Sequence, residues 1–167
     1  TSGSQSVNSL VNYLLVFNSA PDQEAAKSAL MTVLGGDNMR FLMPVLREGS
    51  PAARKSAIEL LAWNHDNKYF SEVLPFTSSS DEQVKSAAYK ALAELAGPAD
   101  QPKLIELLSI TEKPEYIAEI QNAIADAAGK LSDPEKRYLR IMNARKGTLQ
   151  REKNNSPAAH RYILSRF

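Results

Sequence analysis

Residues 50–63 read SPAARKSAIELLAW, and residues 81–95 read DEQVKSAAYKALAEL. Each stretch opens with a Ser or Asp that can cap a helix, and apolar residues then follow the i, i+3, i+4, i+7 spacing of a helical stripe. The stripe recurs along the chain at spacings of 31, 31 and 32 residues, in the pairs Ala29-Leu30, Leu60-Leu61, Ala91-Leu92 and Ala123-Ile124. A regular step of this size predicts a helical repeat protein.

A second ladder of apolar pairs has nearly the same step and predicts two helices, A and B, in each repeat. Its members are spaced 31, 30, 32 and 31 residues apart: Leu14-Leu15, Val45-Leu46, Pro75-Phe76, Leu107-Leu108 and Tyr138-Leu139. We expect A helices at residues 6–17, 38–47, 68–76, 100–109 and 132–145. We expect B helices at residues 21–33, 51–64, 81–95 and 114–128, each ending in a left-handed turn near Gly35, Asp66, Gly97 or Gly129.

The helix pairs predict an all-α fold, because no stretch alternates with a period of two for long enough to indicate a sheet. The expected architecture is a right-handed α-solenoid of about four and a half antiparallel helix pairs. The repeat array is expected over residues 1–145, followed by a linker at 146–155. Residues 156–167 begin like another B helix and predict the start of a further or capping helix.

The openings of two B helices resemble the second helix of HEAT-like repeats. In Ser50–Ala57 (SPAARKSA) and Asp81–Ala88 (DEQVKSAA), a basic residue comes one place after a small apolar one. The resemblance covers roughly residues 6–145. It implies the stacked helix pairs of an α-solenoid.

A second resemblance concerns residues 95–108 (LAGPADQPKLIELL) and 120–128 (IQNAIADAA). They are similar to helical-repeat segments of large secreted bacterial proteins that also carry a 3-keto-disaccharide hydrolase domain. This resemblance implies an accessory domain of a secreted carbohydrate-active hydrolase, with the catalytic domain outside this chain.

The composition is that of one folded domain of ordinary size: 43% of the 167 residues are hydrophobic and 23% are charged. No apolar run approaches the roughly 18 residues that a membrane span needs, so we expect no membrane insertion. The chain has no cysteine, which excludes disulfides, thiolate catalysis and Cys-based zinc sites. Because the chain begins at Thr1 without a leader, we expect a processed protein or a piece of a larger one, either cytoplasmic or secreted.

Charge is distributed unevenly. Residues 1–129 carry 10 Lys and Arg against 16 Asp and Glu, and residues 130–167 carry 10 against 3. Lys136, Arg137 and Arg140 fall within two turns of the last expected A helix and form a candidate anion-binding stripe. They suggest nucleic-acid binding as an alternative function, although the acidic first four repeats argue against it.

Motifs for catalysis are missing from the sequence. It contains no Gly-rich phosphate loop and no GxSxG elbow. His65 and Asp66 lack a third metal ligand nearby, because the other histidine is His160. We therefore expect no enzyme, no metal and no cofactor, and we interpret His65-Asp66-Asn67 as the turn after a B helix.

Trp63, the single tryptophan, occupies a position that is polar in the other repeats. One interpretation is that the helix over-rotates slightly, so that Trp63 fills the core. The other leaves Trp63 exposed on a line of B-helix residues that we call the B-helix ridge. Its rows are Glu24-Ser28-Thr32, Lys55-Glu59-Trp63, Ser86-Lys90-Glu94 and Ala118-Asn122-Asp126.

In stacked helix pairs the B helices usually line the concave surface that binds partners. The sequence therefore predicts a non-catalytic protein-interaction scaffold whose partner is another protein or a neighbouring domain of the same polypeptide. The candidate partner-binding residues are Lys55, Ile58, Glu59, Trp63, Tyr89, Lys90 and Glu94. For Ile58 and Tyr89 the alternative is packing between adjacent B helices.

Overall fold

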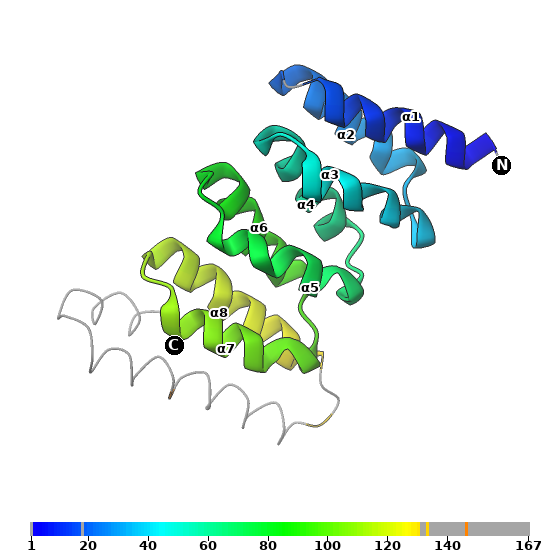
Figure 1. Ribbon diagram of the computed structural model, residues 1–167. Helices are drawn as coiled ribbons and strands as arrows, with labels where there is room; N and C mark the ends of the chain where they lie inside the picture. Colours follow the sequence, from blue (N-terminus) through cyan, green and yellow to red (C-terminus); the bar gives the residue numbers. More distant parts are fainter. Residues whose placement is uncertain (1, 18, 131–132, 134–145, 147–167) are drawn as a thin grey trace. The chain divides into compact units, whose positions relative to one another are not determined.

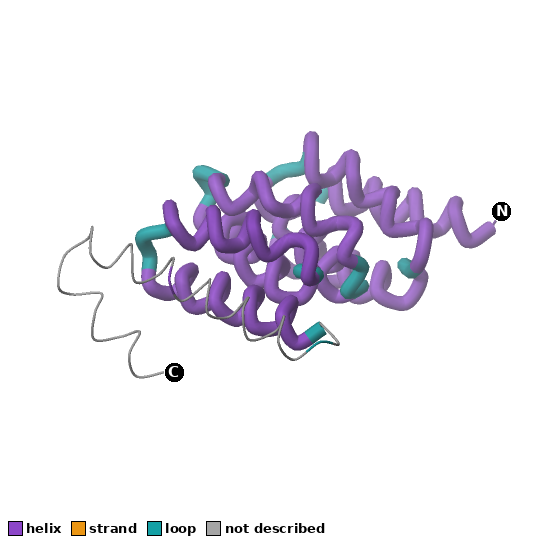
Figure 2. The backbone as a smooth tube through the Cα atoms, turned by 90° about the horizontal axis from the view of Figure 1, so that it is seen from below, coloured by secondary structure: helices purple, strands orange, loops and turns teal. Residues whose placement is uncertain are grey.

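The computed structural model describes residues 2–17, 19–130, 133 and 146 of the chain. Every regular element among these residues is a helix (Figure 2). The chain divides into two compact units, Thr1–Leu95 (unit 1) and Ala96–Phe167 (unit 2). The predicted all-α repeat fold is therefore confirmed over the described part of the chain.

Unit 1 contains three helix pairs, coloured blue to green in Figure 1. The first pair consists of α1 (Ser2–Val16) and α2 (Ala20–Val33). The second consists of η1 (Gly36–Leu42), α3 (Met43–Glu48) and α4 (Pro51–Trp63). The third consists of η2 (Asn67–Tyr69), α5 (Phe70–Val73), η3 (Leu74–Ser78) and α6 (Glu82–Leu95). Helix α4 packs between α2 and α6, so the B helices lie next to one another.

Unit 2 contains one described helix pair. Its elements are η4 (Pro98–Asp100), α7 (Gln101–Ile110) and α8 (Pro114–Gly129). Helices α7 and α8 pack against each other as the A and B helices of the pair. The expected A helix at 132–145, the linker at 146–155 and the final helix at 156–167 lie almost entirely outside the described residues.

The B helices begin where the sequence places capping residues. The Ser50 hydroxyl accepts a hydrogen bond from the Ala53 N–H at 3.3 Å. The Asp81 carboxylate accepts hydrogen bonds from the N–H groups of Gln83 and Val84, both at 3.0 Å. These bonds satisfy N–H groups that the first turn leaves free. The side chain of Lys113, which precedes α8, makes no capping bond.

Two of the expected A helices are divided into short α and 3₁₀ segments. Pro44 lies in the first turn of α3, and Pro75 lies in η3. Proline lacks an N–H group, and its ring collides with the carbonyl four residues earlier, so a continuous α-helix cannot run through either residue. The prediction of single helices at 38–47 and 68–76 is therefore wrong in detail.

The first apolar ladder forms the core of the repeats. Leu30, Leu61 and Leu92 are fully buried, and Ile124 is 3% exposed. Burying one such side chain contributes about 1.5–3 kcal/mol. In the third repeat the second apolar ladder does not mark a core position. Pro75 is exposed there, and Val73, two residues earlier, is buried.

The expected left-handed glycines do not occur at the ends of the B helices. Gly35 has φ 173° and Gly97 has φ −111°, both extended, and Gly129 lies within α8. The described non-glycine residue with positive φ is His65, at 52°. The turn after α4 therefore places the left-handed conformation one residue before Asp66, whose side chain instead accepts a hydrogen bond from the Lys68 N–H at 3.1 Å.

Candidate functional site

Trp63 is the last residue of α4, and 43% of it is exposed. Its equivalents Thr32 on α2 and Glu94 on α6 are exposed as well. The helix therefore does not over-rotate, and the interpretation that Trp63 fills the core is wrong. Unit 1 carries three rows of the B-helix ridge, on α2, α4 and α6, with Trp63 as its one aromatic residue.

Two of the candidate partner-binding residues are buried in the structure. Ile58 is fully buried, and Tyr89 is 5% exposed. Because both side chains are buried, neither can offer itself to a partner, in line with the alternative interpretation that they pack within the helix stack. Lys55, Glu59, Trp63, Lys90 and Glu94 remain at least partly exposed.

An ion-pair network joins α2 to α4 along the ridge. Lys27 Nζ lies 2.6 Å from Glu59 Oε2 and 2.8 Å from Glu24 Oε2, and its side chain is only 14% exposed. Lys55 Nζ lies 3.6 Å from Glu59 Oε1. Desolvation lowers the pKa of Lys27, but the hydrogen bonds and charges of Glu24 and Glu59 outweigh it, so the pKa is raised above the ordinary lysine value.

The Lys27–Glu59 pair was not predicted from the sequence, although a signal for it was present. The two residues carry opposite charges and stand 32 positions apart, which is one repeat. In a stack of equivalent helices, a separation of one period places side chains on neighbouring helices. Opposite charges at that separation were therefore a usable sign of contact.

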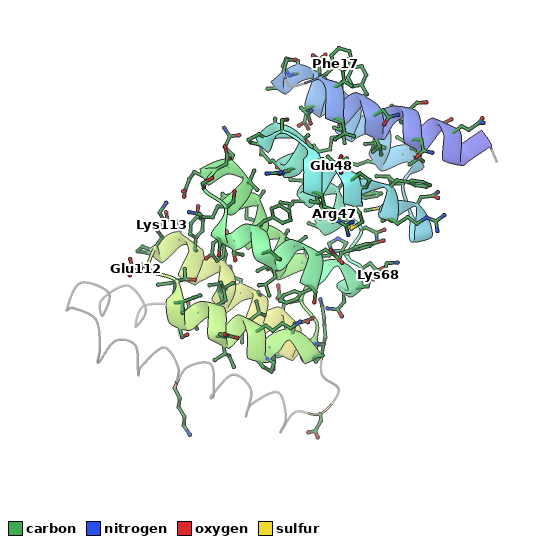
Figure 3. All side chains as sticks on the ribbon, in the orientation of Figure 1. Phe17, Arg47, Glu48, Lys68, Glu112 and Lys113 are labelled. Carbon is green, nitrogen blue, oxygen red and sulfur yellow. The ribbon has the colours of Figure 1, made fainter. Side chains whose placement is uncertain are left out.

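A second polar contact joins the turn after α4 to α6. His65 Nδ1 lies 3.1 Å from Glu94 Oε2, and both side chains are more than half exposed. In η2, which follows this turn, Lys68 (Figure 3) has its Nζ atom 2.7 Å from Asp66 Oδ2. The side-chain hydrogen bond from Lys68 lowers the pKa of Asp66, and the same bond raises the pKa of Lys68. In the described part of the chain, no three His, Asp or Glu side chains converge as metal ligands.

Lys90 and Val33 are two further exposed residues on the B helices of unit 1. Lys90 lies on α6 one turn before Glu94 and forms no ion pair with any described residue. Val33, the last residue of α2, is 38% exposed. The ridge of unit 1 thus combines the exposed ring of Trp63 with the exposed charges of Lys90 and Glu94.

An open cavity of about 270 Å³ lies at the N-termini of α4 and α6. It is lined by Ser50, Pro51, Ala52, Asp81 and Gln83. The Ser50 hydroxyl and the Asp81 carboxylate are already engaged as helix caps. Both groups thus already serve the helix starts, and the ridge is the stronger candidate site.

The candidate anion-binding residues Lys136, Arg137 and Arg140 lie outside the described residues, and nucleic-acid binding by them stays a prediction. Among the described residues, no helix has the length and apolar character needed to cross a membrane.

Paired helices repeated at this step define an α-helical repeat protein. The family model for HEAT repeats matches residues 39–125, which is more than half of the chain. The chain belongs to the HEAT-repeat family, as its sequence resemblance predicted. HEAT repeats commonly serve as protein-interaction scaffolds and are generally non-catalytic. No curated protein matches the chain.

Proposed function

We propose that this chain is a non-catalytic protein-interaction scaffold that binds its partner through the B-helix ridge of unit 1. The family supports an interaction role, and the exposure of Trp63 is the observation that supports this particular surface. Tryptophan is enriched among the residues that dominate interface energetics. The partner is another protein or a neighbouring domain of the same polypeptide.

The exposed part of Trp63 is large enough to matter energetically. An aromatic side chain buries about 150–250 Å², so covering the 43% that remains exposed is worth roughly 2 kcal/mol. A contribution of that size changes affinity about thirtyfold. Trp63 also lies at the end of a helix packed on both sides, so its backbone is held in place before a partner arrives.

The test is a selection of phage-displayed random peptides on the immobilised full chain. Selected peptides are then measured against a ridge variant that combines Trp63→Ala with Lys90→Glu. We expect this variant to bind at least about tenfold more weakly while its helical circular dichroism stays unchanged. Equal binding by a folded ridge variant would contradict the proposal.

A matched control variant also replaces one exposed apolar residue by alanine and one basic residue by glutamate, but at positions outside the ridge. It combines Val16→Ala on α1, where 68% of Val16 is exposed, with Arg47→Glu on α3 (Figure 3). Both residues belong to A helices. We expect the control to bind the selected peptides as the wild type does.

Nucleic-acid binding through the basic C-terminal region is the second candidate. The observation that favours it is the excess of 10 Lys and Arg over 3 Asp and Glu in residues 130–167. Phosphate contacts of this kind give an affinity that falls steeply with salt. A full chain that is not retained on a DNA column at low salt would end this alternative.

A further inference from the structure

The C-terminal end of α1 carries a cluster of exposed apolar side chains. Three of the six large apolar residues that are exposed in the described chain fall within five positions here: Tyr13 at 36%, Val16 at 68% and Phe17 at 42%. The Phe17 N–H donates to the Tyr13 carbonyl at 3.0 Å, and the two rings stack with their centroids 4.1 Å apart (Figure 3 labels Phe17). Residues at i, i+3 and i+4 share one helix face, so the three side chains form a single patch, which we call the α1 patch.

The positions of the α1 patch are not ones that the stacking of repeats covers. When Leu14 is aligned with Val45 and with Leu107, the equivalent residues are Pro44, Arg47 and Glu48 in the second repeat and Glu106, Ser109 and Ile110 in the fourth. All six are exposed. The second repeat lies between two others in unit 1, so these positions stay open to solvent even with a neighbour on each side. The α1 patch is therefore suited to a contact outside the helix stack.

Helix α1 carries no charge. The first 21 residues contain no Asp, Glu, Lys or Arg, and the exposed polar side chains of the helix are amides and hydroxyls: Gln5, Ser6, Asn8, Ser9 and Asn12. The first charged residue is Asp22, whose carboxylate accepts hydrogen bonds from the hydroxyls of Tyr13 at 3.1 Å and Ser19 at 2.5 Å. Neither an acidic nor a basic partner would gain an ion pair from α1 itself, so the chemistry of this face favours an uncharged partner surface.

We infer that α1 is a self-association surface, through which two copies of this chain pair about a two-fold axis. In such a contact the same face of both copies meets, so any charge on it would be opposed by its own kind. Because α1 has no charge, this repulsion is absent, and the α1 patch of each copy is removed from water at once. Amides and hydroxyls both donate and accept, so the polar positions also complement themselves. The surface is separate from the B-helix ridge, and the inference goes beyond the proposed function.

The size of α1 determines how strong the pairing is. A helix of 15 residues is about 22 Å long and about 10 Å wide, whereas a stable interface takes about 800 Å² from each partner. One helix face supplies less than this area. We therefore expect a weak dimer, with a dissociation constant on the order of 100 μM.

The test is sedimentation equilibrium of the full chain between about 5 μM and about 1 mM. We expect the weight-average mass to rise from the 18.4 kDa of the monomer toward twice that value. Val16→Arg and Phe17→Arg each place a cation opposite its own copy, so each should weaken dimerisation at least about tenfold with unchanged helical circular dichroism. Ile110→Arg is the matched control, because Ile110 is the equivalent of Phe17 in the fourth repeat and is 70% exposed. We expect it to dimerise as the wild type does.

Salt separates this contact from an association between charged regions. Because α1 carries no charge, dimerisation should not weaken between about 50 mM and about 500 mM NaCl. The inference is overturned by a chain that stays monomeric at about 1 mM, or by an association that the arginine variants at Val16 and Phe17 leave unchanged. An association that salt removes, or that Ile110→Arg abolishes equally, also overturns it. None of these results affects the proposed function, which is tested by peptide binding at Trp63.

Discussion

Lys27 Nζ lies 2.6 Å from Glu59 Oε2, although the two residues are 32 positions apart in the sequence. The pair connects the B helices of the first two repeats, and Lys27 also contacts Glu24 within α2. It holds the two helices in register and places a cation between Glu24 and Glu59. It also leaves the fold with a measurable dependence on pH.

Replacing Lys27 by Met should destabilise the fold by about 1–2 kcal/mol at neutral pH, because Glu24 and Glu59 lose a hydrogen-bonded cation. The pKa of Lys27 is raised in the folded chain, so the stabilisation is complete below the unfolded value of 10.5. It is then lost as the pH rises through the folded pKa. Urea unfolding should be measured at about pH 7 and at about pH 11. The difference in the free energy of unfolding between wild type and variant should be smaller at the higher pH. Lys90→Met is the control, and we expect it to change the free energy of unfolding little at either pH. A loss of stability for Lys27→Met that is the same at both pH values would contradict the raised pKa of Lys27 in the folded chain.

Replacing His65 separates backbone strain from the contact with Glu94. Both His65→Gly and His65→Ala remove the imidazole, but only glycine adopts φ 52° without a steric cost. We expect the glycine variant to be about 1 kcal/mol more stable than the alanine variant in thermal or urea unfolding. At Asn64, where φ is −74° and ψ is −14°, the order should reverse, with alanine more stable than glycine. An alanine variant at position 65 that is the more stable of its pair would show that the turn is not held in the left-handed conformation.

Replacing Gly49 by Ala tests the close packing of the turn between α3 and α4. A Cβ atom at Gly49 would collide with the backbone carbonyl of Val45 and would also lie 3.1 Å from Ala53 Cβ. We expect a loss of about 1–3 kcal/mol in the free energy of unfolding. Gly129→Ala in α8 is the matched control, because nothing lies within 4 Å of its added Cβ and alanine favours the helix. If both variants retain wild-type stability, the turn is more open than the structure shows.

The period of the sequence was sufficient to predict the B helices and their core. Leu61 and Leu92 stand one repeat apart, and both are fully buried. The A helices were harder, because proline is tolerated in the first turn of a helix and breaks its interior, so the effect of Pro44 and Pro75 depends on where each helix begins. A repeat period identifies equivalent positions but does not report where a local break changes the helix type.

The candidate site was predicted only in part. Ile58 and Tyr89 were placed on the binding surface because the stripe of one helix does not show how much of its flank the next helix covers. Trp63 had two possible orientations, since a small rotation of α4 would have moved it from the surface to the core. The neighbouring helices set that rotation, and they are known only once the fold is known.

The most direct test of the account is iodide quenching of Trp63 fluorescence in the free chain and with a selected peptide bound. Because Trp63 is the single tryptophan and is 43% exposed, we expect readily quenched emission from the free chain. Binding at the ridge should shield the indole, so that quenching falls when the peptide is present at saturation. A peptide that binds the chain and leaves the quenching of Trp63 unchanged would contradict the claim that partners bind through this surface.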